Sequence, residues 1–276
     1  MDGSAISVRF WGVRGSIACA GPQTARYGGN TACVELRCGG HTLVFDAGTG
    51  IRPLGLALAR EPAADLDLFF SHTHLDHVLG LPFFAPALTA GRRLRLWAGH
   101  LLPAMTLEAA VRRMMTPPLF PVPVETLRAD LEFRDFRAGE TLRPCTGVTV
   151  RTAPLDHPDG ATGYRVEHGG RAVAYVTDIE HRPGERAAAV VDLVRGADLM
   201  IYDSTYTDAE FVERKGWGHS TWEEALRVAD AAGVGRVVLF HHDPGHDDDF
   251  MDAVAAAAAI SRPGTVVARE GETLTA

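Results

Sequence analysis

Ser71-His72-Thr73-His74-Leu75-Asp76-His77 follows directly after the apolar run Leu66–Phe70, which predicts a buried strand. Three imidazoles and one carboxylate within six residues form a donor set suited to zinc, manganese or iron. Side chains two apart on an extended segment share a face, so His72 and His74 can bind one ion. Asp76 and His77, past the turn, can face a second ion. Because α/β folds place ligands at strand ends, the pattern favours a metal site over a solvated histidine-rich loop.

Size and composition predict a single domain over residues 1–276. Hydrophobic residues make up 46% of the 276 residues, enough for a sizeable core. No apolar run is long enough for a membrane span, and residues 1–4 lack signal-peptide features. The four cysteines include no CxxC pair, so we expect reduced thiols in a cytoplasmic protein. The formal charge of −8 argues against a large nucleic-acid surface.

The order of predicted elements indicates two sheets with helices outside. Strands are predicted at 6–11, 32–37, 42–46, 66–70, 94–98, 148–152, 163–167, 172–177, 198–203, 236–241 and 265–269. Helices are predicted at 51–60, 104–115, 186–195, 221–232 and 248–260. Four prolines exclude a helix or central strand over 116–123. We therefore expect an α+β fold, a four-layer αββα sandwich of two mixed sheets.

Four more apolar strands end in a residue that can bind a metal. These residues are Asp46, His157, Asp178 and His241. One such residue alone is more often a cap or a surface group. Five such strand ends in one chain are hard to attribute to capping, and they predict a site assembled at one sheet edge.

With these residues in order, the chain resembles the metallo-β-lactamase superfamily from Asp46 to His241. The resemblance implies that His72, His74 and His157 hold one ion, that Asp76, His77 and His241 hold a second, and that Asp178 bridges both. It also implies that Asp46 supports the histidines through hydrogen bonds. His242 is the alternative to His241, which fits the family's apolar-x-His pattern better. Zinc is the expected metal at both positions, with manganese or iron as alternatives.

Two positions distinguish branches of this superfamily. His74 stands where redox members carry Glu, and Asp178 stands where true β-lactamases carry Cys. Both therefore favour hydrolysis of esters or phosphodiesters. The run Gly216–Thr221 resembles the His-Ser-Thr motif of the phosphodiesterase branch, which includes tRNA 3′-processing endonucleases and small cyclic phosphodiesterases. Capping of the following helix explains Ser220 and Thr221, but it does not explain His219.

This resemblance implies a catalytic set of His219, Asp203 and Asp76. A hydroxide shared by the two ions would attack phosphorus, since a metal-bound water has a pKa of ~7. His219 would protonate the leaving oxygen as the general acid, and Asp203 would orient it. Asp203 stands where the tRNA enzymes have Glu, which weakens the match to those enzymes and keeps the carboxylate–imidazole pair. Asp76 would serve as a metal ligand as well.

The expected substrate is a small phosphodiester such as a cyclic nucleotide. The chain has no long arm rich in glycine and basic residues of the kind that the tRNA enzymes use, so a large nucleic acid is not expected. The alternative is a carboxylic-ester or thioester hydrolase, similar to lactonases, that uses the same two ions. A non-enzymatic metal-binding module is disfavoured, because no ligand is missing. A homodimer remains open.

The N-terminal segments Phe10–Ser16 and Tyr27–Thr31 look like the start of bacterial phosphodiesterase-like members. Their glycines fit turns. Arg14 or Asn30 could in addition reach a phosphate, and His242 is a third candidate for substrate binding.

Overall fold

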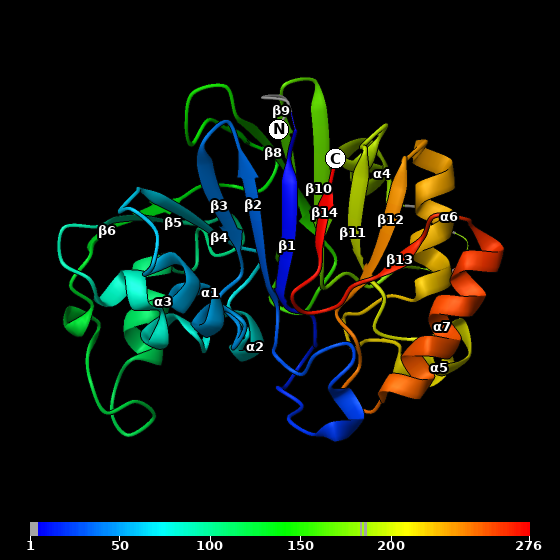
Figure 1. The fold of residues 1–276 in the computed structure, drawn as a ribbon, viewed down its shortest axis with the longest axis horizontal. Coiled ribbons are helices and arrows are strands. Elements are labelled where there is room, and N and C mark those ends of the chain that lie inside the picture. Colours follow the sequence, from blue (N-terminus) through cyan, green and yellow to red (C-terminus); the bar gives the residue numbers. More distant parts are fainter. Residues whose placement is uncertain (1–4, 183, 185–186) are drawn as a thin grey trace.

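The computed structural model describes residues 5–182, 184 and 187–276, and it contains two seven-stranded sheets (Figure 1). In spatial order, the first sheet consists of β14 (Thr273–Thr275), β1 (Ser7–Gly12), β2 (Cys33–Cys38), β3 (His41–Phe45), β4 (Leu66–Phe70), β5 (Arg93–Ala98) and β6 (Asp130–Asp135). The second consists of β13 (Val266–Val267), β12 (Arg236–Phe240), β11 (Leu199–Asp203), β10 (Arg171–Val176), β9 (Ala161–His168), β8 (Thr149–Leu155) and β7 (Thr141–Leu142).

Helices cover the outer faces of both sheets. They are α1 (Ile51–Leu58), α2 (Leu75–Val78), α3 (Leu107–Met114), α4 (Ala188–Val194), α5 (Asp208–Arg214), α6 (Trp222–Ala232) and α7 (Asp248–Ser261). Four short 3₁₀ helices span Pro22–Thr24, Leu81–Phe83, Ala85–Leu88 and Val124–Thr126. Figure 1 shows α1 to α3 on the side of the first sheet and α4 to α7 on the side of the second.

Three apolar cores separate the four layers. One lies between the sheets and contains Phe10, Phe45 and Tyr175. A second packs α1 and α3 on the first sheet, and a third packs α4, α6 and α7 on the second. The predicted four-layer αββα sandwich is confirmed.

Strand direction gathers the strand ends that matter for function. β3, β4, β5 and β6 are parallel to one another, and so are β10, β11, β12 and β13. The carboxyl ends of parallel neighbours lie at the same edge of a sheet. The residues that follow these strands are therefore brought together.

Several short elements escaped prediction. β6 is an edge strand whose sequence, Asp-Leu-Glu-Phe-Arg-Asp, is charged at every second position. Charged edge strands are common, because they prevent pairing with other chains, but they lack a hydrophobic signal. α5 begins at a capping box formed by Thr207 and Glu210, a signal that was available in the sequence. No helix of the described residues is both long and apolar enough to cross a membrane.

Candidate metal centre

Strand ends from both sheets converge on one cluster of imidazoles and carboxylates. The residues follow β3 (Asp46), β4 (His72), β8 (His157), β10 (Asp178) and β12 (His241). The short helix α2 adds Asp76 and His77 one turn after His72. The structure thus brings together the residues that the sequence singled out at strand ends.

The backbone around this cluster is strained. Within the described residues, positive φ outside glycine occurs at Ser16, Asp46, Asp159, Asp178 and His241. The two that do not follow a strand still touch the cluster, since Ser16 N–H donates to Asp76 at 2.7 Å and the Asp159 carboxylate lies 3.6 Å from His74 Nε2. Each such residue costs about 1–3 kcal/mol and persists only where the surroundings impose it, typically at functional sites.

A first group consists of three imidazoles. His72, His74 and His157 each offer a nitrogen within 4.8 Å of the others. His157 Nε2 lies 3.1 Å from His74 Nδ1, and the buried His72 Nε2 has no hydrogen-bond partner among the described residues. Ligands about 2.0–2.1 Å from a tetrahedral zinc ion lie roughly 3.4 Å apart. The spacing and the unpartnered nitrogen therefore fit an ion.

A second group combines imidazoles and a carboxylate. His77 Nε2 and His241 Nε2 are 3.3 Å apart. Asp76 Oδ2 lies 3.2 Å from the first nitrogen and 3.4 Å from the second. These distances also match the edges of a metal coordination polyhedron.

Asp178 stands between the two groups. Its Oδ1 lies 3.9 Å from both His72 Nε2 and His157 Nε2. Its Oδ2 lies 3.2 Å from His77 Nε2 and 3.3 Å from His241 Nε2. Each carboxylate oxygen therefore faces a different group of imidazoles.

Hydrogen bonds on the far ring nitrogens orient three of the histidines. His77 Nδ1–H donates to Asp46 at 2.9 Å, and His157 Nδ1–H donates to the carbonyl of Gly218 at 2.7 Å. The Thr205 hydroxyl donates to Asp203 at 2.7 Å, so it accepts from His241 Nδ1–H at 3.1 Å. Because each Nδ1 donates to its partner, each Nε2 is the nitrogen that remains to bind an ion.

Electrostatics give His72 and Asp178 the protonation states that a cation needs. Burial, together with the neighbouring His77, lowers the pKa of His72 well below its usual value and keeps the ring neutral. Burial alone would raise the pKa of Asp178, but His241 and His77 hold it well below its usual value. Neutral imidazoles and charged carboxylates are the ligand forms that bind divalent ions. At His77, burial would lower the pKa, but Asp76, Asp178 and Asp46 raise it well above its usual value, so an ion there would displace a proton.

His219 lies beside the cluster and pairs with a fully buried carboxylate. Its Nδ1 is 3.1 Å from Asp203 Oδ2 and 3.7 Å from Asp178 Oδ1. Burial alone would lower the pKa of His219, but Asp203 raises it to about 9. A divalent ion on Asp178 would oppose this rise, because like charges repel. The pair therefore holds a proton donor against the edge of the cluster.

The three residues expected to contact substrate point away from the cluster. Arg14 is fully buried, and its guanidinium donates to the carbonyls of Gly28 and His246 at 2.8 and 2.6 Å. The Asn30 amide donates to Glu270 at 2.9 Å. His242 Nε2–H donates to the carbonyl of Ala268, also at 2.9 Å. These contacts hold the N-terminal loop in place. The structure therefore does not support the expected role of these three residues in phosphate binding.

Sequence reasoning overlooked two residues that support the site. Thr205 links Asp203 to His241, as described above, and no role was predicted for it from the sequence. Glu180, two residues after Asp178, accepts hydrogen bonds from the backbone N–H groups of Gly216 and Gly218, each at 2.8 Å. Nothing in its local sequence marks it, because its partners lie 36 and 38 residues away.

An Asp46→Asn variant is expected to bind ions about 10–100-fold more weakly. The reason is that an amide cannot accept all the hydrogen bonds that the Asp46 carboxylate accepts. The donors of these bonds are Ser71 N and Oγ, Tyr175 Oη and His77 Nδ1. Competition with a chromophoric chelator measures the change. Asp67→Asn is the matched control, since Asp67 is also buried but bonds to Arg95. Equal ion affinity in both variants would refute the supporting role.

Two glycines of one loop allow a second matched test. Gly216 and Gly218 both have positive φ, at 86° and 83°, but a Cβ on Gly218 would lie 2.4 Å from His157 Nδ1, whereas one on Gly216 meets nothing within 4 Å. Replacing either with Ala should cost about 1–2 kcal/mol of stability through backbone strain. Only Gly218→Ala should also weaken ion binding, by displacing His157. Thermal unfolding and chelator competition on both variants would separate the two effects.

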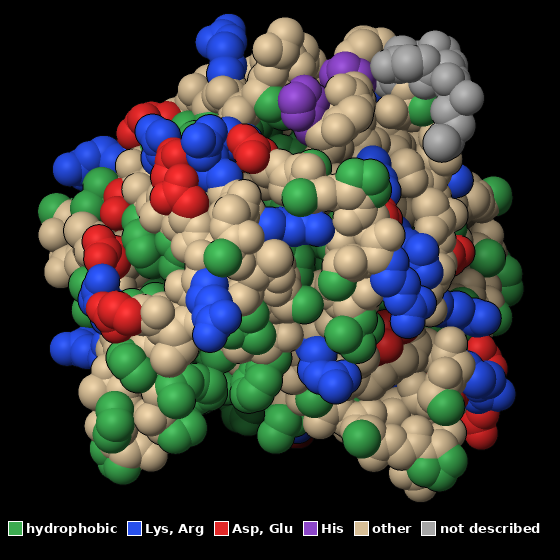
Figure 2. Space-filling model, turned by 60° about the vertical axis from the view of Figure 1, so that its left-hand side comes forward, with side chains coloured by type: hydrophobic (Ala, Val, Ile, Leu, Met, Phe, Trp, Pro, Cys, Tyr) green, Lys and Arg blue, Asp and Glu red, His purple; other side chains and the backbone are tan. Residues whose placement is uncertain are grey.

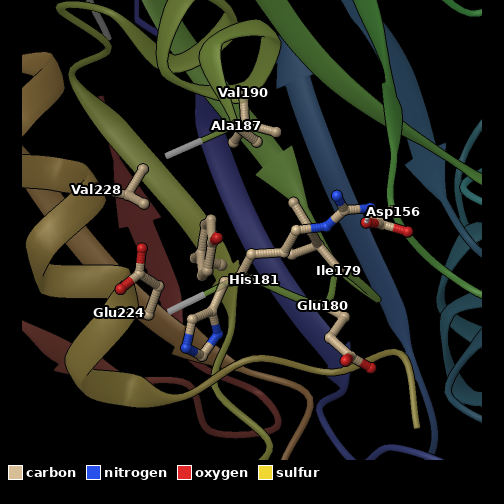
Figure 3. Close-up of a pocket in the computed structure, with 10 residues that line it drawn as sticks. Asp156, Ile179, Glu180, His181, Ala187, Val190, Glu224 and Val228 are labelled. Carbon is tan, nitrogen blue, oxygen red and sulfur yellow. Dashed lines mark hydrogen bonds and ion pairs between the residues drawn. The ribbon is translucent and has the colours of Figure 1, made fainter. Parts of the chain in front are cut away.

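A cavity of about 240 Å³ lies beside the cluster. In Figure 3, Asp156 and Glu180 lie on one side of it, and Glu224 and Val228 of α6 lie on the other. Asp156 precedes His157, and Glu180 lies two residues past Asp178, so the cavity shares strand ends with the cluster.

An apolar rim borders the cluster on the side of α2. Figure 2 shows hydrophobic side chains gathered along the lower part of one face of the molecule. The exposed apolar side chains of α2 and of the segments after it include Leu75, Leu79, Phe83, Leu88, Leu119 and Val122. Phe83 contacts Phe120 with ring centroids 6.0 Å apart, whereas Phe84 is buried in the core.

Comparisons with known proteins agree with this geometry. Residues 41–242 match the family model described as beta-lactamase superfamily domain. A ribonuclease Z of Gemmatimonas aurantiaca is 27% identical, with 96% of this chain and 94% of the relative covered. Two solved structures share the fold. The metallo-beta-lactamase fold protein YhfI of Bacillus subtilis has a TM-score of 0.73 at 20% identity, and covers 99% of this chain and 100% of its own. The short form of human tRNase Z has a TM-score of 0.67 at 20% identity, and covers 97% and 98%.

The family and the ribonuclease relative bear out the resemblance seen in the sequence, including the phosphodiesterase branch. They also confirm the predicted class of enzyme, a metal-dependent hydrolase of phosphoric diesters. Because the matching region contains the whole cluster from Asp46 to His241, the chain belongs to the beta-lactamase superfamily.

Proposed function

We propose that the cluster binds two divalent ions and that the protein hydrolyses nucleotide phosphodiesters. The ion ligands in this proposal are His72, His74 and His157 for one ion, Asp76, His77 and His241 for the other, and Asp178 for both. The position of Asp178 carries the proposal, because its two oxygens face different groups of imidazoles. Zinc is the expected ion, and manganese or iron fit the same donors.

Two such ions supply Lewis acidity for a phosphoryl group and activate water at neutral pH. The chain's own residues provide orientation and a proton. Asp46, Gly218 and Thr205 fix the rings of His77, His157 and His241. His219 Nδ1–H faces Asp203, which fixes the ring, so the proton available for transfer is the one on Nε2. In this proposal His219 gives its proton to the leaving oxygen, which would otherwise depart as an alkoxide.

Two substrate sizes remain in the proposal. A small diester such as a cyclic nucleotide is supported by the lack of a long arm rich in glycine and basic residues within the described residues. The region between His157 and Asp178, for example, contains little besides the β9–β10 hairpin with its two-residue turn. The alignment with the ribonuclease Z spans 315 positions, more than the 276 residues of the chain, so that relative has residues without counterpart here. The same relative is, however, named as a ribonuclease, which argues against the expectation that a large nucleic acid is not a substrate. A tRNA precursor is therefore the second candidate.

A substrate panel tests the proposal. The purified, zinc-loaded protein would be assayed with a 2′,3′-cyclic nucleotide, a 3′,5′-cyclic nucleotide, a dinucleotide and a tRNA precursor with a 3′ extension. We expect hydrolysis of at least one diester and loss of that activity when a chelator removes the ions. Hydrolysis of a lactone or a thioester with no activity on any diester would refute the proposal.

A further inference from the structure

Lys215 is the only lysine among the 27 lysine and arginine residues of the chain. It lies just past the end of α5, next to Arg214 and four residues before His219. No ion pair joins Arg214 or Lys215 to a carboxylate within the described residues. Two uncompensated positive charges therefore adjoin the candidate site in a chain whose formal charge is −8.

The loop that continues from Lys215 is held firmly at both ends. The Glu180 carboxylate accepts hydrogen bonds from the N–H groups of Gly216 and Gly218, each at 2.8 Å. The Gly218 carbonyl accepts from His157 Nδ1 at 2.7 Å. Figure 3 shows Glu180 at the edge of the neighbouring cavity. The position of the loop relative to the cluster is thus fixed by its own hydrogen bonds.

Trp217 is the last residue of an exposed stretch, 212–217, and buried residues follow it directly. Its side chain is 59% exposed, while Gly218 and His219 are buried. Two peptide units separate Trp217 from His219, so their Cα atoms lie within about 7.6 Å of each other. The Arg214 guanidinium lies 5.0 Å from the centroid of the indole ring. A large aromatic surface is thus presented to solvent within reach of the proton donor.

Hydrogen bonds connect this loop to the most exposed of the proposed ligands. Among the proposed ligands, His74 has the most exposed side chain, at 40%. Its ring is 3.1 Å from His157, which in turn bonds to Gly218, the residue after Trp217. A ligand that enters past His74 therefore meets this loop.

We propose that residues 214–217, here called the recognition loop, bind the nucleotide portion of the substrate. Trp217 stacks on a base, and Lys215 and Arg214 contact a phosphate. The inference rests on the proposed function and names its substrate class more closely. Exposed aromatic rings beside basic side chains are the usual means of binding single-stranded nucleotides without reading their sequence. Lys supplies a mobile point charge for this purpose, where Arg would fix a planar geometry.

Stabilisation of the end of α5 explains only part of the arrangement. Cations near a helix carboxyl end interact favourably with its dipole, which accounts for Arg214 and Lys215. It does not account for an exposed indole on a loop that is fixed by three hydrogen bonds. A role in ligand binding accounts for both.

Base-dependent kinetics test the stacking. We expect Trp217→Ala to lower kcat/KM for thymidylyl-(3′,5′)-thymidine by about 5- to 150-fold, as for loss of one stacked base. The same substitution should lower kcat/KM far less for an analogue that lacks the stacked base. Two analogues of the dinucleotide, each abasic at one of its two nucleotides, would therefore be compared. Ile260→Ala, which removes another exposed side chain (84%) at the C-terminal end of α7, is the control and should behave as wild type. Equal losses with the dinucleotide and both abasic analogues would overturn the inference.

Chemical labelling of Lys215 provides a test that does not depend on turnover. An amine-specific acetylating reagent can modify only Lys215 and the N-terminal amine, which serves as the internal reference. We expect thymidine 5′-phosphate to slow acetylation of Lys215 in the zinc-loaded wild type. Ribose 5-phosphate, used in place of the nucleotide, should give no protection. The nucleotide should also give no protection in Trp217→Ala. Absence of protection in the wild type would overturn the inference even if diesters are hydrolysed. Protection without hydrolysis of any diester would refute the proposed function alone.

Discussion

An Asp178→Asn variant is expected to bind its ions about 10²- to 10⁴-fold more weakly than the wild type. Removal of one partner from a buried pair of charges costs about 3–5 kcal/mol, which corresponds to this range. The reason is the position of this carboxylate between four imidazole nitrogens, at 3.2 to 3.9 Å. Diester hydrolysis should fall with the ion content. Chelator competition and elemental analysis of the purified variant would measure both.

The charge of Asp178, rather than its volume, is the feature under test. Burial would raise its pKa, but the surrounding histidines hold the pKa well below its usual value, so the carboxylate is charged in the folded protein. Asn keeps the shape and removes the charge. Asp198→Asn is the control, because Asp198 accepts a hydrogen bond from Ala172 N just before β11 begins, away from the cluster. Wild-type ion affinity in Asp178→Asn would contradict the assignment.

A His219→Ala variant is expected to lose about 10²–10⁴-fold in kcat while keeping its ions, since general acids contribute on this scale. The ring lies 3.1 Å from Asp203 and is not needed to complete either group of proposed ligands. The loss should depend on the leaving group. It should be large for a nucleotide that leaves as an alkoxide and small for an activated nitrophenyl diester, which departs without a proton.

Matched variants separate this role from a structural one. Asp203→Asn keeps the His219 ring but removes its charged partner, so it should show a smaller loss with the same dependence on the leaving group. His168→Ala, on the β9–β10 hairpin, should behave as wild type. A His219→Ala variant that loses equal activity on alkoxide and nitrophenyl substrates would show that His219 is not the general acid.

The sequence predicted the fold and the residues of the cluster because both depend on strand ends. Apolar runs marked β4, β10 and β12, and a histidine or an aspartate lies within two residues of the end of each run. Parallel pairing then brings such residues to one edge whatever the details of packing. The same logic missed β6, whose charged alternation gives no hydrophobic signal.

The direction of individual side chains could not be predicted in the same way. Arg14 was expected to reach a phosphate, yet its guanidinium is buried against backbone carbonyls. Glu180 acts on Gly216 and Gly218 through long-range contacts that no local pattern reveals. Lys215 is the single lysine of the chain, but only its place in the fold gives it significance.

Stepwise addition of zinc to the metal-free protein, with diester hydrolysis measured at each step, tests the two-ion site most directly. We predict that the rate rises to its maximum at two equivalents of zinc per chain and does not increase beyond them. Full activity at one equivalent, or no activity at two, would contradict a centre in which Asp178 serves both ions.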